Sequence, residues 1–136
     1  MYEINDLTLK YKDEIVNNAY VATNTGVVTL LSSVSYIKIP VVENTTLYFL
    51  VMENPYTNVP SHSGAFKDIN DNYISNFIID TLYTDALQII KVPVGAVNLY
   101  INFQTIYFDR FALLNIPGYL SDKIKPDLLT YTDLKI

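Results

Sequence analysis

An unbroken alternation of apolar and polar residues runs through Val97-Asn98-Leu99-Tyr100-Ile101-Asn102-Phe103-Gln104. Successive side chains of a β-strand point to opposite faces, so one face of this stretch is oily and the other carries Tyr100 among amides. A strand with two such faces packs on a core through its oily side. The stretch is therefore predicted to be a half-buried strand.

Five further segments are rich in β-branched and aromatic residues and are predicted to be strands as well. They cover residues 36–41, 47–52, 73–79, 87–92 and 111–116. Turn signals separate them at residues 23–26, 68–72 and 93–95, and residues 53–64 are predicted to form one long surface loop. Many short strands with turns at near-regular spacing are typical of a sandwich or jelly roll.

The predicted fold class is therefore all-β, an antiparallel jelly-roll-like β-sandwich over residues 15–116 with short arms outside the sandwich at both ends. The chain of 136 residues has room for one domain of this kind. Residues 1–14 are charged and weakly periodic, and we expect a linker, a short helix or an added strand there. Residues 117–136 keep several apolar side chains, so this arm either packs on a neighbouring subunit or frays.

Composition excludes several classes of function. Half of the residues are hydrophobic and 17% are charged, with a formal net charge of −5. Neither a basic stripe for phosphate groups nor an apolar run long enough to span a bilayer is present, so we expect no nucleic-acid binding and no membrane insertion. The chain has no cysteine. This excludes disulfides, zinc–thiolate sites and cysteine nucleophiles, and it favours assembly in a cytoplasm.

No arrangement for catalysis is apparent, so we predict no catalytic residues, no metal and no cofactor. His62 lies between two serines in one loop, whereas a catalytic triad needs groups that converge from separate elements. The scattered carboxylates are expected to be solvated. Residues 68–72 resemble the start of a calcium loop, but Tyr73 and Ile79 stand where the loop needs its glycine and its bidentate glutamate. A tight hairpin turn capped by Asx side chains is the preferred interpretation; another calcium geometry stays open.

Twelve tyrosines and no tryptophan make up an unusual aromatic set. A tyrosine joins a flat apolar face to a hydroxyl group, and amide side chains beside it both donate and accept hydrogen bonds. Together they suit sugar rings, although they suit protein interfaces and the edge of a core as well. Tyr100 lies between two such amides, and Tyr56 lies in the long loop.

Three stretches, in order, resemble the jelly-roll, carbohydrate-binding-module-like domains of bacteriophage tail fibres, baseplates and related virion appendages. They are Ser35–Val41 followed by Thr46–Phe49, then Gly64–Ser75, and then Ile90–Ala96 leading into Tyr100–Phe103. The likeness covers about residues 17–116 and includes Phe-x-Asp-x-Asn before Tyr-Ile-Ser, and Val-Pro-x-Gly-Ala. It implies a virion location and an appendage role.

The resemblance implies a non-catalytic module that recognises a host-surface glycan and contacts other virion proteins. Weak single sites would gain avidity from a homo-oligomer, with a trimer favoured. The predicted ligand-binding residues are Tyr56, His62, Asn70, Asp71, Tyr73, Asn98 and Tyr100. The alternative is a structural or decoration protein of the capsid or tail that binds only other virion proteins, which the low charge and the apolar C-terminal arm favour.

Overall fold

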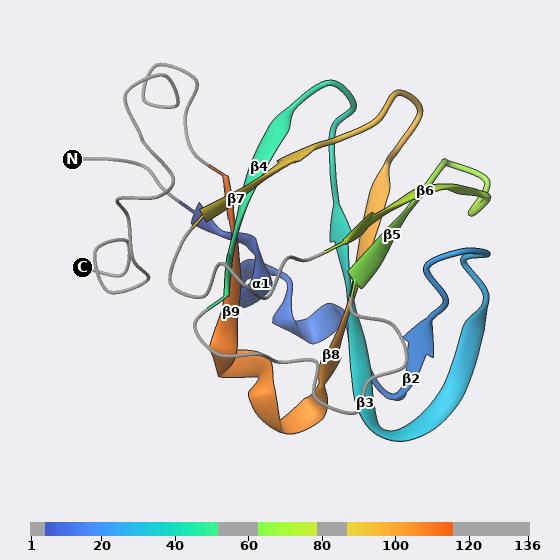
Figure 1. Ribbon diagram of the computed structural model, residues 1–136, viewed down its shortest axis with the longest axis vertical. Helices are drawn as coiled ribbons and strands as arrows, with labels where there is room; N and C mark the ends of the chain where they lie inside the picture. Colours follow the sequence, from blue (N-terminus) through green and yellow to red (C-terminus); the bar gives the residue numbers. More distant parts are fainter. Residues whose placement is uncertain (1–4, 52–62, 79–86, 116–136) are drawn as a thin grey trace.

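The computed structural model describes residues 5–51, 63–78 and 87–115, which form a sandwich of two antiparallel β-sheets (Figure 1). This confirms the predicted all-β sandwich. The first sheet has the order β1-β9-β4-β7 and the second has the order β2-β3-β8-β5-β6. Predictions for Tyr56, His62 and residues 117–136 lie outside the described residues.

The four-stranded sheet contains β1 (Asn5–Asp6), β9 (Phe111–Asn115), β4 (Thr46–Val51) and β7 (Leu87–Lys91). The five-stranded sheet contains β2 (Ile15–Val21), β3 (Val28–Pro40), β8 (Asn98–Gln104), β5 (Ser63–Lys67) and β6 (Tyr73–Ile78). The described residues also contain three short helical segments: α1 (Leu7–Lys10), η1 (Lys12–Glu14) and η3 (Thr105–Arg110). The predicted segments match β4, β6, β7, β8, β9 and the end of β3, but β3 begins well before residue 36, and β2 and β5 were not predicted to be strands.

The core lies between the two sheets. Leu99, Ile101 and Phe103 of β8 are almost completely buried there, as the alternation predicts. They meet an aromatic group from the opposite sheet, in which the rings of Phe49 and Phe111 stack with centroids 5.6 Å apart. The ring of Phe103 lies 5.2 Å from that of Phe111, so the aromatic contacts join the two layers directly.

The segment expected to form an arm at the N-terminus belongs to the sandwich from residue 5 onward. Strand β1 pairs with β9, and Leu7 of α1 is buried in the core. The Asp6 carboxylate caps α1 by accepting hydrogen bonds from the backbone N–H and the hydroxyl of Thr8 at 3.0 and 2.6 Å. The sequence offered both a short helix and an added strand as alternatives, and the structure contains both.

The residues around the predicted long loop also need a correction. Ser63 and Gly64, expected in that loop, belong to β5, which pairs with both β6 and β8. Gly64 faces the interior of the sandwich, in register with Phe77 and Ile101. A glycine next to a loop resembles a turn residue in sequence, whereas here it allows a close approach between strands.

Candidate functional site

The outer face of the five-stranded sheet is covered by part of the chain itself. Between β2 and β3 the pairing shifts register after Asn17, where Asn18 adopts a φ of 61°. Beyond this bulge Ala19–Val21 pair with Val28–Leu30, and we call residues 19–33 the arm. Val21 and Ala19 are buried at 0% and 1% exposure, Val21 against Tyr100 and Ala65. The amide-rich face of β8 is therefore covered at Tyr100 and Asn102 and is not open along its whole length.

Asn102 anchors the arm. Its carboxamide accepts a hydrogen bond from the Val21 N–H and donates one to the Val21 carbonyl, both at 2.8 Å. Asn102 has no exposed surface, so these bonds are shielded from water. The side chain acts in the same way as the backbone of a neighbouring strand, because it satisfies one donor and one acceptor of the same residue.

The tip of the arm is held over β6 by two side chains that share one acceptor. The Tyr73 hydroxyl donates to the Thr23 carbonyl at 2.7 Å, and the Asn76 amide donates to the same oxygen at 3.0 Å. Gly26, at a φ of +74°, lets the tip turn close to the Tyr73 side chain. Tyr73, one of the predicted ligand-binding residues, thus fixes the arm with its hydroxyl.

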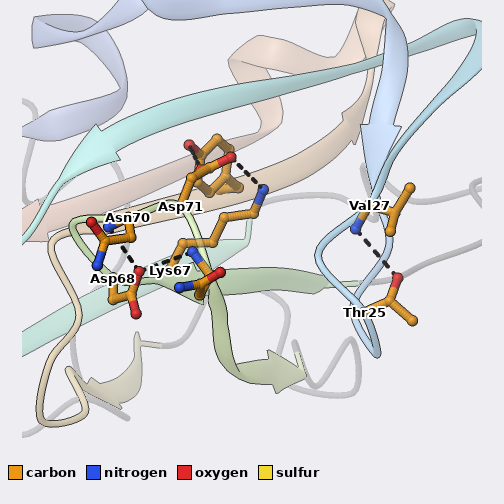
Figure 2. A network of polar contacts seen from close by, with 8 residues as sticks. Thr25, Val27, Lys67, Asp68, Asn70 and Asp71 are labelled. Carbon is orange, nitrogen blue, oxygen red and sulfur yellow. Dashed lines mark hydrogen bonds and ion pairs between the residues drawn. The ribbon is translucent and has the colours of Figure 1, made fainter.

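Beside the arm, Lys67, Asp71 and Tyr100 form a polar cluster (Figure 2). The Tyr100 hydroxyl donates to Asp71 Oδ1 at 3.1 Å, and Lys67 Nζ lies 3.5 Å from Asp71 Oδ2. The Lys67 ammonium also lies 4.8 Å from the centroid of the Tyr100 ring, which is cation–π geometry. The Lys67 side chain is 5% exposed whereas that of Asp71 is 67% exposed. The cluster thus joins a buried cation to a carboxylate in water.

Tyr100 and Tyr36 are held in their neutral forms. Burial raises the pKa of Tyr100, and the hydrogen bond to the Asp71 carboxylate, with its negative charge, raises it further. Burial also raises the pKa of Tyr36, with a smaller contribution from the charge of Asp71. Their rings lie 5.8 Å apart, so ionisation of either would place a charge beside the other under the arm.

Stability is expected to fall as the pH rises above about 10, the ordinary pKa of tyrosine. Above that pH Tyr100 loses its proton in the unfolded chain, whereas the folded chain keeps the proton on Tyr100. The contribution of Tyr100 to the free energy of unfolding is therefore complete below that pH and is lost as the pH rises above it. The expected slope is about 1.4 kcal/mol per pH unit for this one residue. Urea unfolding of the wild type and of Tyr100→Phe at several pH values around 10 would measure it. Equal slopes in the two proteins would contradict the assignment.

The turn between β5 and β6 has the predicted Asx capping. Asp68 Oδ1 accepts from the N–H groups of Asn70 and Asn72, both at 2.9 Å, and the Asp68 N–H donates to the Asn72 carbonyl. Asp71 adopts a φ of 64°, which directs its carboxylate toward Tyr100 and Lys67. The side chain of Asn70 is exposed at this turn. In the described part of the chain no group of three or more His, Cys, Asp and Glu is placed to hold a metal ion.

A small open hollow lies at the end of the same sheet where β3 leaves and β8 begins. It has a volume of about 210 Å³ and is lined by Tyr11, Glu14, Lys38, Pro40 and Asn98. Pro40 pairs with Asn98 across the sheet, and Lys38 is on the same face of β3. The segment before β2 closes the hollow with Tyr11 and Glu14. One aromatic ring, one carboxylate, one ammonium group and one amide therefore meet at one place.

The predicted ligand-binding residues are divided between these features. Asn98 lines the hollow, whereas Asp71 and Tyr100 are bonded to each other and Tyr73 supports the arm. Tyr100 is only 6% exposed, so its ring is not an open platform on which a sugar can stack. Four residues of the hollow were not predicted: Tyr11, Glu14, Lys38 and Pro40. Strand alternation predicts that the side chains of residues 38 and 40 point outward. No local sequence pattern predicts that residues 11 and 14 lie next to them.

Comparison with known proteins adds no relative: no family model, curated protein or solved structure matches this chain. Among the described residues, no helix is both long and apolar enough to cross a membrane. Of the features described above, the hollow is the one that combines exposure to solvent with side chains of several chemical types. It is the candidate site.

Proposed function

We propose that this domain is a non-catalytic appendage module of a bacteriophage virion, in a tail fibre, a baseplate or a head fibre, and that it recognises a host-surface glycan. The observation that carries the proposal is the hollow lined by Tyr11, Glu14, Lys38, Pro40 and Asn98. Its volume is below the roughly 300–1,000 Å³ of typical drug-sized pockets, so it suits one sugar ring.

The connectivity of the strands supports the comparison with virion jelly rolls. From β3 to β4 and from β4 to β5 the chain crosses between the sheets, and it does so again from β6 to β7, β7 to β8 and β8 to β9. Apart from β2, four strands lie in each sheet. Two four-stranded sheets connected in this alternating way support a double-sheet jelly roll, a fold that occurs among viral capsid and lectin domains.

The side chains of the hollow suit a neutral, hydroxyl-rich ligand. Tyr11 contributes an aromatic side chain, the Asn98 amide both donates and accepts, and Glu14 and Lys38 add one strong acceptor and one strong donor. Their charges are of opposite sign, so the hollow favours neither anions nor cations strongly. A shallow, solvated site binds weakly, and many copies on one particle would give the avidity that attachment needs.

Asn98 offers a direct test of this site. Glycan-array screening of the full chain should identify a retained sugar, and titration with that sugar should show at least a tenfold loss of affinity for Asn98→Ala, or about 1.4 kcal/mol. The matched control is Asn70→Ala, because Asn70 is exposed and is also a predicted ligand-binding residue, but lies in the β5–β6 turn. We expect Asn70→Ala to bind within about twofold of the wild type.

Three results would lead to different conclusions. Loss of binding only in Asn98→Ala supports the hollow. If Asn70→Ala loses binding instead, the sugar is held at the turn, and the assignment of the hollow is wrong. If the wild type retains no glycan even when it is displayed in many copies, the glycan-binding function itself is contradicted.

A specific observation favours the alternative, a structural or decoration protein that binds only other proteins of the virion. Five apolar side chains in the β2–β3 region are exposed by more than a third: Val16, Val27, Val28, Leu30 and Leu31. Exposed apolar side chains concentrated in one region are typical of protein interfaces. A structural role needs no sugar, so the glycan array separates the two functions.

A further inference from the structure

The outer strand of the arm has a free hydrogen-bonding edge. The Val21 N–H and C=O bond to Asn102, so they point away from β3, and Val21 and Val28 are a non-hydrogen-bonded pair. The Ala22 N–H donates to the Val27 carbonyl, so the neighbouring pair of residues is hydrogen-bonded, as the alternation of pair types requires. Because pair types alternate along an antiparallel ladder, Val28 and Leu30 direct their N–H and C=O groups off the far edge of the arm.

No described strand covers that edge. Strand β8 pairs with β3 only from Val34 to Pro40, so residues 28–30 have β2 on one side and no strand on the other among the described residues. In Figure 1 the first part of β3 lies at the rim of the molecule. A strand with one open edge is a template for another strand.

The same strand lacks the charges and prolines that usually prevent such pairing. Residues 15–37 contain no Asp, Glu, Lys or Arg, although 17% of the whole chain is charged. Leu30 is 85% exposed and Val27 is 59% exposed. Natural proteins protect open edges with lysine, proline, bulges or inward-pointing charges, and no such charge or proline lies between residues 27 and 33. The outer strand of the arm therefore has the composition of a buried strand.

Apolar side chains are exposed next to this edge. Val28 is 46% exposed and Leu31 is 36% exposed, in addition to Val27 and Leu30. Exposed apolar side chains concentrated in one region are typical of protein interfaces. A partner strand at this edge would therefore have apolar side chains to cover.

We propose that the arm pairs with the arm of a second copy of this chain, antiparallel and about a two-fold axis at Thr29. In this register Val28 of one copy faces Leu30 of the other and exchanges both backbone hydrogen bonds with it. Val27 faces Leu31, and the two Thr29 residues form a non-hydrogen-bonded pair. The sequence Val27-Val28-Thr29-Leu30-Leu31 is apolar on both sides of its centre, so it complements itself.

Charge is compatible with a second copy meeting at the arm. Each copy has a formal net charge of −5, so most surfaces of two copies repel one another. The uncharged arm is where two copies approach without bringing carboxylates together. The interface also leaves the hollow on η1, β3 and β8 outside the paired residues, so this inference does not depend on the proposed glycan-binding function.

The oligomeric state is the first test. Size-exclusion chromatography with light scattering should give the mass of a dimer for the full-length wild type and half that mass for Leu30→Lys. The matched control is Ile69→Lys, because Ile69 is 79% exposed but lies in the β5–β6 turn, and this variant should stay dimeric. Circular dichroism would check that both variants keep their strands. A monomeric or trimeric wild type would overturn the proposal, as would a dimeric Leu30→Lys.

Cross-linking tests the register independently. The chain has no cysteine, so each introduced thiol is the only one. A non-hydrogen-bonded pair has its Cα atoms about 4.5 Å apart, which is within the range of a disulfide, so oxidised Thr29→Cys should form a covalent dimer. Ser32→Cys lies on the same strand, but its two copies would be about 20 Å apart and should not cross-link. Equal cross-linking of both variants would contradict a two-fold axis at Thr29.

Discussion

Replacing Asn102 with leucine is expected to lower the free energy of unfolding by about 3 kcal/mol or more. The substitution keeps the branched shape and the number of non-hydrogen atoms in the side chain but removes both hydrogen bonds to Val21. Val21 is fully buried, so its N–H and C=O would both lose their partners out of reach of water. Each orphaned group costs about 1–3 kcal/mol, which exceeds any gain from the more apolar side chain.

Asn76→Leu is the matched control for this prediction. Asn76 also bonds a carbonyl of the arm, but it is exposed, and the Tyr73 hydroxyl donates to the same Thr23 oxygen. Its loss leaves that oxygen satisfied, so we expect a cost below about 1 kcal/mol. Urea unfolding at one fixed protein concentration would compare the two variants, since self-association makes stability depend on concentration. Equal costs would show that Asn102 does not anchor the arm.

Local alternation in the sequence predicted the strands and the oily face of β8, because burial of Leu99, Ile101 and Phe103 follows directly from a period of two. It could not predict whether the opposite face of β8 is exposed or covered. An amide that faces water and an amide that bonds a buried backbone give the same pattern in sequence. Only the path of the arm, which returns to within 2.8 Å of Asn102 from 81 residues away, separates the two cases.

The candidate site was predicted in part for the same reason. Asn98 was identified from its place on an amide-rich strand face, and it does line the hollow. Tyr11 and Glu14 were not, because they belong to a segment whose packing depends on β1 pairing with β9 at the far side of the sandwich. Tyr100 has the right chemistry for a sugar platform but is covered by the arm. Exposure is a tertiary property, and residue type alone does not determine it.

Gly64→Ala is the second substitution with a large expected effect, a loss of at least about 3 kcal/mol in the free energy of unfolding. A Cβ atom on Gly64 would overlap the backbone carbonyl oxygen of Tyr100 and the Cε1 atom of Phe77. The oxygen belongs to β8, the strand with which β5 pairs, so it cannot move aside without separating the two strands. The overlap would therefore disturb both the sheet and the cluster of Lys67 and Tyr100 on its outer face.

Gly95→Ala separates this steric effect from the general effect of replacing a glycine. Gly95 has a φ of +85°, but the nearest atom to an added Cβ is Ile74 Cδ1 at 3.7 Å, so only backbone strain of about 1 kcal/mol is expected. A second comparison locates the overlap. If the carbonyl is the obstacle, adding Phe77→Leu to Gly64→Ala should recover less than about 1 kcal/mol in a double-mutant cycle. Full recovery would instead identify the Phe77 ring as the obstacle, and a Gly64→Ala protein as stable as Gly95→Ala would contradict the close approach of β5 and β8.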